Sequence, residues 1–165
     1  MAMGITFNPD EILQMAEQIE RNAGKFYRQA AGRAKDRSTR GLFEELAAME
    51  DGHLQVFSAM RARLTERQKE PTVFDPDDQI GLYLQAMADA KGIEGKIGPD
   101  MELTGNETAE QVLNIALNAE HNSVVFYVGL KALVKADEDR HQVEQVIQEE
   151  MGHIATLHRR LMALR

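Results

Sequence analysis

The sequence predicts an all-α protein, a four-helix bundle built from two similar helix hairpins. Three observations support this fold class. Apolar residues recur at helical spacing over most of the chain. The four prolines, at positions 9, 71, 76 and 99, fall outside the interiors of the expected helices. Residues 108–165 also repeat the pattern of residues 8–65, with Glu20 and Glu120 in register.

The composition of the chain argues against several classes of function. A chain of 165 residues is expected to form one domain, here 1–165. A net charge of −8 argues against binding to duplex nucleic acid or to an anionic membrane surface. No apolar run is long enough to span a bilayer, and the first ten residues lack the pattern of a secretion signal, so a cytoplasmic location is expected.

The sequence contains no cysteine. Disulfides, thiolate metal sites and iron–sulfur relays are therefore excluded within these residues. A metal site here would have to use nitrogen and oxygen ligands.

The first hairpin is predicted over residues 8–67. Asn8 is expected to cap a helix that begins at Pro9 and fades near residues 32–36. A second helix is expected to begin at Asp36 or Ser38 and to run to about Arg67.

A long crossover is predicted over residues 68–107. Helix is broken at Asp75, because the residue before a proline is biased away from helical geometry. A short amphipathic helix is then expected, followed by a turn-rich loop at residues 92–105. The apolar positions of this helix are Ile80, Leu82, Tyr83, Met87 and Ala90.

The second hairpin is predicted over residues 108–165. Thr108 and Gln111 form a capping box for a third helix that reaches about Lys135. Asp137 is expected to cap a fourth helix that continues to the C-terminus. Two like hairpins joined by a long crossover are the plan of the ferritin-like four-helix bundle.

Six residues are predicted to bind metal because they recur in register on all four helices. In each half, a glutamate on the first helix is followed on the second helix by a Glu-x-x-His motif, whose two side chains share one helix face. Such a set is the recipe for a carboxylate-bridged site for two metal ions. The predicted ligands are Glu20, Glu50, His53, Glu120, Glu150 and His153.

Charge balance supports two divalent cations at this site. Four buried carboxylates without counterions would each be costly, and two divalent ions neutralise all four. Iron or manganese fits a site rich in oxygen with two nitrogens, and zinc would be adventitious. The competing interpretation is a duplicated bundle that kept these polar residues without binding metal.

Other residues receive weaker assignments. Tyr27 and Tyr127, seven residues after Glu20 and Glu120, are expected either to orient the carboxylates of the opposite half or to fill the core. Three histidines without repeat partners are interpreted as structural or surface residues, including the one in Glu138-x-x-His141. These histidines are His121, His141 and His158. Six methionines at helical spacing are expected to fill the core. They are Met15, Met49, Met60, Met87, Met151 and Met162.

The segment from Glu20 to Tyr27, the motif from Glu50 to His53 and their second-half copies resemble the rubrerythrin branch of the ferritin-like superfamily. The resemblance covers nearly the whole chain. It implies a non-haem di-iron centre with two iron ions, often in a dimer, that reacts with hydrogen peroxide or dioxygen. No catalytic residue beyond the metal ligands is implied.

The chain departs from typical rubrerythrins in two ways. It has no four-cysteine rubredoxin segment, so the resemblance implies an external electron donor. Where the family has an additional glutamate after the third-helix ligand, this chain has Ser123. Three reactions stay open: an oxidoreductase that reduces peroxide or dioxygen, a ferroxidase or iron-binding protein without organic substrate, and a di-iron hydroxylase. A non-enzymatic interaction module ranks last.

Overall fold

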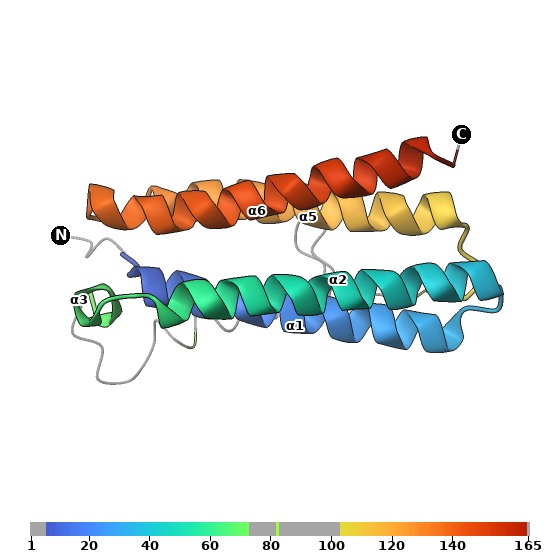
Figure 1. Ribbon diagram of the computed structural model, residues 1–165, viewed down its shortest axis with the longest axis horizontal. Helices are drawn as coiled ribbons and strands as arrows, with labels where there is room; N and C mark the ends of the chain where they lie inside the picture. The colour runs from blue at the N-terminus through green and yellow to red at the C-terminus, as the bar shows by residue number, and fades with distance from the viewer. Residues whose placement is uncertain (1–5, 73–81, 83–102, 165) are drawn as a thin grey trace.

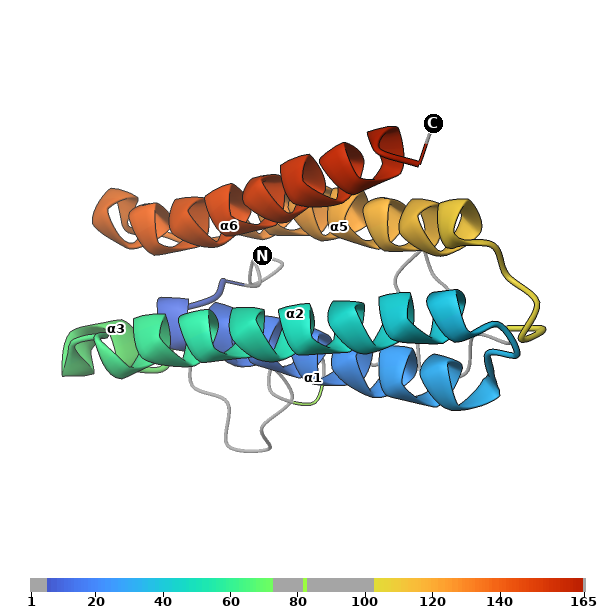
Figure 2. The same cartoon turned by 45° about the vertical axis from the view of Figure 1, so that its right-hand side comes forward.

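The computed structural model describes residues 6–72, 82 and 103–164, and these residues form a four-helix bundle of two antiparallel hairpins (Figure 1). The predicted fold class is confirmed. One layer holds the first hairpin and the other holds the second, and both views show the layers stacked (Figure 2). The helices are α1 (Pro9–Arg33), α2 (Arg37–Ala62), the short α3 (Glu66–Lys69), α5 (Ala109–Lys131) and α6 (Asp137–Met162).

Side-chain caps fix where three of the long helices begin. Asn8 and Glu11 form a capping box at α1, and Thr108 and Gln111 form the predicted one at α5. Asp36 caps α2 by accepting a hydrogen bond from the backbone N–H of Thr39 at 2.7 Å. These three predicted starts are confirmed.

The predicted start of the fourth helix was wrong. Ala136 is the N-cap of α6 and makes no side-chain cap bond, while Asp137 is the first helical residue. The carboxylate of Asp137 pairs with Arg140, so it is engaged within the first turn instead of capping it. Three acids in this turn still interact favourably with the positive end of the helix dipole.

Two helices end earlier than the sequence predicted. α5 ends at Lys131 instead of about Lys135, because Val134 turns inward and is 2% exposed. α2 ends at Ala62 instead of about Arg67, because Leu64 is likewise buried and Thr65 starts α3. α3 opens the crossover, and the amphipathic helix expected around residues 80–90 lies outside the described residues, Leu82 excepted.

The apolar interior consists of two clusters, one at each end of the bundle. The first joins the start of α1, the end of α2, the end of α5 and the start of α6; its largest members are Phe7, Ile12, Phe57 and Tyr127. The second joins the opposite ends of the same helices; its largest members are Phe26, Tyr27, Phe43 and Leu113. The middle level of the bundle, between these clusters, is where the polar side chains of the next section lie.

Methionines divide between the core and the surface. Met15 is buried, and Met49 and Met60 pack against the clusters, as predicted. The same prediction was wrong for Met151 and Met162, which are 57% and 51% exposed. Helical spacing places these two residues on the outside of α6, because the inward positions are already taken by ligands and aliphatic residues such as Leu157.

Candidate metal centre

Each hairpin brings one glutamate and one Glu-x-x-His pair to the middle of the bundle. Glu20 comes from α1 and Glu120 from α5, while α2 and α6 carry the two pairs. All six predicted residues meet between the two apolar clusters. Among the side chains that the structure describes, five of the six form two groups whose ligand atoms lie within 4.8 Å of one another: Glu20, Glu50 and His53, and His53, Glu120 and His153. The sixth, Glu150, lies 3.0 Å from His153.

The two halves repeat the same geometry. His53 Nδ1 lies 2.9 Å from Glu50 Oε2 and 3.4 Å from Glu20 Oε2. His153 Nδ1 lies 3.0 Å from Glu150 Oε2 and 3.6 Å from Glu120 Oε2. Two atoms that bind the same transition-metal ion at about 2.0–2.2 Å stand roughly 3 to 3.5 Å apart. The shorter contact in each half, which is a hydrogen bond in this structure, is also close enough for both atoms to bind one ion.

The halves meet through their imidazole rings. The rings of His53 and His153 stack with 3.2 Å between centroids and 4° between planes. This contact joins α2 to α6 at the level of the carboxylates.

The carboxylates are buried far from water. Glu20 and Glu50 are each 4% exposed, Glu120 is 7% exposed, and Glu150 is fully buried. Burial of four acids in one layer is unfavourable unless a positive charge accompanies them.

Burial makes two of these acids hold their protons more tightly than free side chains do. Burial raises the pKa of Glu20 well above its usual range, and the negative charge of Glu50 raises it further. Burial also raises the pKa of Glu120, against the lowering effect of its hydrogen bond with His153. Burial alone would lower the pKa of His153, but hydrogen bonds to Glu120 and Glu150 raise it to about 9.

One oxygen of the site lacks any hydrogen bond. Glu150 Oε1 is buried and has no hydrogen-bond partner within the described part of the chain. An orphaned carboxylate oxygen beside other acids and imidazole nitrogens is a ligand position suited to a cation. The oxygen-rich donor set with two nitrogens fits iron or manganese, and the residues present therefore fit the implied metal pair.

The two tyrosines lie in the apolar clusters that flank the site. Both are almost completely buried, and burial raises the pKa of each well above its usual value. The next largest contribution to this rise comes from Glu50 at Tyr27 and from Glu150 at Tyr127. The Tyr127 hydroxyl has no hydrogen-bond partner among the described residues, so it makes no direct bond to a carboxylate there. The orienting role predicted for these tyrosines stays a prediction.

The remaining candidate residues lie away from the site. Glu138 is 70% exposed at its side chain and pairs with Arg67, and His141 and His158 are exposed. His121 is exposed and its Nδ1 lies 2.7 Å from the Leu117 carbonyl oxygen. These placements agree with the surface interpretation.

One buried acid near the site escaped the sequence analysis. Glu17, three residues before Glu20, is 6% exposed, and its second-half counterpart is Leu117. Glu17 pairs with Arg21 at 2.9 Å and with Arg61 of α2 at 3.6 Å, which accounts for its burial. The four-residue spacing of Glu17 and Arg21 could have indicated their ion pair from the sequence. The contact with Arg61 could not have been predicted in this way, because Arg61 lies on another helix.

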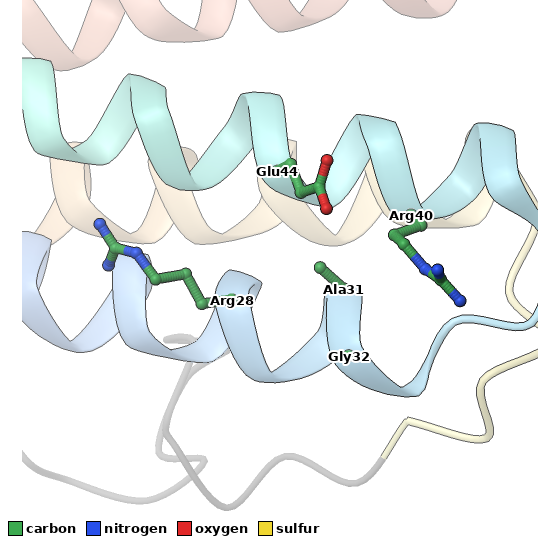
Figure 3. Close-up of a pocket in the computed structure, with 5 residues that line it drawn as sticks. All are labelled: Arg28, Ala31, Gly32, Arg40 and Glu44. Atoms are coloured by element: carbon green, nitrogen blue, oxygen red, sulfur yellow. The ribbon is translucent and has the colours of Figure 1, made fainter.

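An open pocket of about 420 Å³ lies between α1 and α2, near the end of the first hairpin (Figure 3). None of the six predicted ligands lines it. Its two arginines are already engaged, Arg28 with Asp51 and Arg40 with the Ala34 carbonyl oxygen. The lining residues are Arg28, Ala31, Gly32, Arg40 and Glu44. Glu44 is the one carboxylate among these lining residues, and a single carboxylate does not make a site for two metal ions.

Fold and site together define a class: the protein is a ferritin-like carboxylate bundle. The rubrerythrin family model matches residues 11–161, so the chain belongs to the rubrerythrin family. None of the curated proteins matches the sequence. No helix in the described ranges is both long and apolar enough to cross a bilayer.

Two solved structures share the fold. A protein of Thermotoga maritima described as a ferritin-like diiron-carboxylate protein is 20% identical, with a TM-score of 0.52; the match covers 97% of this chain and 98% of that one. A hypothetical protein of Pyrococcus furiosus is 22% identical, also with a TM-score of 0.52, over 96% of this chain and 90% of that one. At these identities the likeness establishes the fold alone.

Proposed function

We propose that this chain is a non-haem di-iron oxidoreductase that reduces hydrogen peroxide or dioxygen with electrons from an external donor. The observation that carries the proposal is the matching contact of each imidazole with two buried carboxylates, with the two halves joined at the stacked rings of His53 and His153. Membership of the rubrerythrin family supports the choice of iron and of an oxidant as substrate.

The side chains have distinct proposed roles. Glu50 and Glu150 each place one oxygen beside the imidazole of the same helix turn, and each would offer its carboxylate to the metal pair. Glu20 and Glu120 would each supply one further carboxylate ligand. His53 and His153 would each supply one nitrogen through Nδ1, and the apolar clusters at both ends exclude water.

The bound metal pair would supply Lewis acidity and two electrons, which are what cleavage of an O–O bond requires. Reduction of one peroxide consumes two electrons and two protons and forms two waters. These 165 residues contain no cysteine, so the electrons have to come from a donor outside them.

The first test is metal content per chain in untagged protein loaded anaerobically with Fe(II). About two irons per chain are expected from the two-ion recipe, and Glu50→Ala/Glu150→Ala should lose them. Glu138→Ala/Glu149→Ala is the matched control, because it removes two exposed acids of α6 and should keep the iron. A wild-type protein that binds no iron would reject the proposal.

The second test compares the rates at which peroxide and dioxygen oxidise the protein. The reduced, loaded protein is mixed with peroxide or with dioxygen, and oxidation is followed by stopped-flow absorbance. Faster oxidation by peroxide is expected; oxidation no faster than by dioxygen would reject the peroxidase reaction.

A ferroxidase is the second candidate, and Ser123 favours it. Ser123 is buried one turn after Glu120, so the site has three ligands per half and no additional carboxylate there. In this reaction Fe(II) is itself the substrate. Repeated oxidation of Fe(II) supplied in excess over two per chain would favour a ferroxidase, whereas a single round would favour the oxidoreductase. A di-iron hydroxylase would need an apolar substrate pocket beside the site, and the crossover segment where such a pocket would be sought, residues 74–90, lies outside the described residues apart from Leu82.

A further inference from the structure

Positive charge is concentrated on one part of this acidic chain. Residues 25–40 contain six basic residues and one acid, Asp36, so they carry a net charge of +5, whereas the rest of the chain carries −13. The repeat counterparts, residues 125–140, contain three basic and three acidic residues and are neutral overall. The concentration therefore belongs to the first hairpin and not to the repeat. We call its six basic residues the basic surface: Lys25, Arg28, Arg33, Lys35, Arg37 and Arg40.

The basic surface is exposed and lies where α1 ends and α2 begins. Among the described residues, only Arg28 has a carboxylate partner, the exposed Asp51. Lys35 and Arg40 bond to neutral groups, the Asn106 side chain and the Ala34 carbonyl oxygen. The other three cations form no ion pair with a described residue. Most of the charge of the basic surface is therefore not neutralised by the chain itself.

The basic surface is hollowed between its two helices. The open pocket of about 420 Å³ has Arg28 on α1 and Arg40 on α2 among its lining residues (Figure 3). When the nearby acids Glu44 and Asp51 are counted as well, the region keeps a net charge of +3. A surface that is positive and concave favours association with a negatively charged partner, because opposite potentials steer the encounter.

The basic surface comes close to a predicted metal ligand at Gly24. This glycine of α1 is buried, and an added Cβ would lie 3.0 Å from Arg28 Nη1 and 3.6 Å from Glu50 Cβ. Gly24 therefore places no side chain between the exposed Arg28 and the buried Glu50, whereas α5 carries Val124 at the repeat position. Electron tunnelling slows steeply with distance, so a thin wall of this kind favours delivery of electrons from outside.

We propose that an acidic electron-carrier protein docks on the basic surface and delivers the electrons consumed at the buried site. This inference rests on the proposed function, which needs electrons from outside these residues. Each carrier loses one electron, so two carriers and two protons reduce one peroxide to two waters. Charge complementarity selects the class of partner, because opposite charges speed the encounter and like charges reject wrong partners.

The first test measures the binding of a plant-type ferredoxin, an acidic iron–sulfur carrier, to the metal-free chain by calorimetry. At about 10 mM salt, where screening is weak, the wild-type chain should bind it, and the affinity should fall as salt rises. Lys25→Gln/Arg33→Gln/Arg37→Gln removes the three cations without an ion pair. This variant should weaken binding by roughly ten- to a hundredfold and depend less on salt.

Arg63→Gln/Lys69→Gln/Lys135→Gln is the matched control. It removes three exposed cations at the other end of the bundle, so it has the same net charge as the first variant and should keep the wild-type affinity. Circular dichroism should show the same helix content in both variants. A wild-type chain that does not bind ferredoxin, or two variants that bind equally well, would overturn the proposal. Binding of duplex DNA instead, through the same three cations, would also overturn it.

Carbodiimide cross-linking followed by peptide mapping tests the place of docking. The reagent joins a carboxylate of ferredoxin to a lysine amine, and Lys25 is the neighbour of Gly24, so a cross-link at Lys25 is expected. Lys25→Arg keeps the charge without an amine, so it should keep binding and lose this cross-link. Cross-links confined to Lys69 and Lys135 would overturn the proposal. Both measurements use the metal-free chain, so their failure is distinguishable from a failure to bind iron.

Discussion

The imidazole rings of His53 and His153 lie face to face, with 3.2 Å between their centroids, and this contact is where the two halves of the sequence repeat meet. Two protonated rings at that separation would repel by roughly 5 kcal/mol at an effective dielectric constant of about 20. Two imidazolium ions in this stack are therefore unfavourable, while the carboxylates beside His153 raise the pKa of that ring to about 9.

Metal binding should release protons. The pKa of about 9 means that His153 holds a proton at neutral pH in the metal-free chain, and burial raises the pKa of Glu20 and Glu120 as well, so each of these groups holds its proton more tightly than a free side chain does. A bound cation has to displace these protons, so affinity should rise with pH up to about 9, where His153 loses its proton unaided. Calorimetric titration in two buffers of different ionisation enthalpy measures the protons released. Equal heats in both buffers would contradict the prediction.

Tyr127→Phe should stabilise the metal-free protein by up to about 1 kcal/mol, because it removes a buried hydroxyl that has no partner among the described residues. Chemical denaturation of the metal-free protein measures this change. The same variant decides the role of the tyrosine. Unchanged metal affinity would make Tyr127 a core residue, whereas a ten- to roughly hundredfold loss would make it an orienting residue for Glu150.

The contact between α3 and α6 should make the free energy of unfolding depend on pH in the acidic range. Arg67 donates to both carboxylate oxygens of Asp139 at 3.0 and 2.8 Å, and these bonds lower the pKa of Asp139 from 3.8. A group whose pKa is lowered by folding stabilises the protein above its unfolded value and loses that contribution as pH falls through the folded value. Asp139→Asn should therefore lower stability near neutral pH and flatten its decline below pH 4, as thermal denaturation across pH would show. Asp137→Asn, at an exposed acid in the same turn, is the control.

Gly105→Ala should destabilise the protein by about 1 to 3 kcal/mol. Gly105 has a φ of 80°, and an added Cβ would lie 2.5 Å from the Arg33 carbonyl oxygen. Gly41→Ala is the matched control, since a Cβ there meets nothing within 4 Å on α2, and it should stabilise by about 0.5 to 1 kcal/mol. Equal effects of the two substitutions on thermal denaturation would contradict this account.

Most of the fold and the positions of the six predicted ligands could be predicted from the sequence, because both depend on local spacing and on the repeat. Helical periodicity brings Glu50 and His53 to one face, and duplication brings a second copy to the same level. Contacts between segments that are distant in the sequence could not be predicted from this pattern. The bond from Arg67 to Asp139 and the inward turn of Val134 depend on tertiary packing, and the predicted helix ends were wrong there.

The two apolar clusters have a consequence for cooperativity. Each is a small core at one end of the bundle, and the layer between them is made of acids and imidazoles. In the metal-free chain we expect this polar layer to couple the two ends weakly, which would broaden the unfolding transition. An ion bound by all four helices would tie one end to the other, and the bundle would then unfold as a single unit.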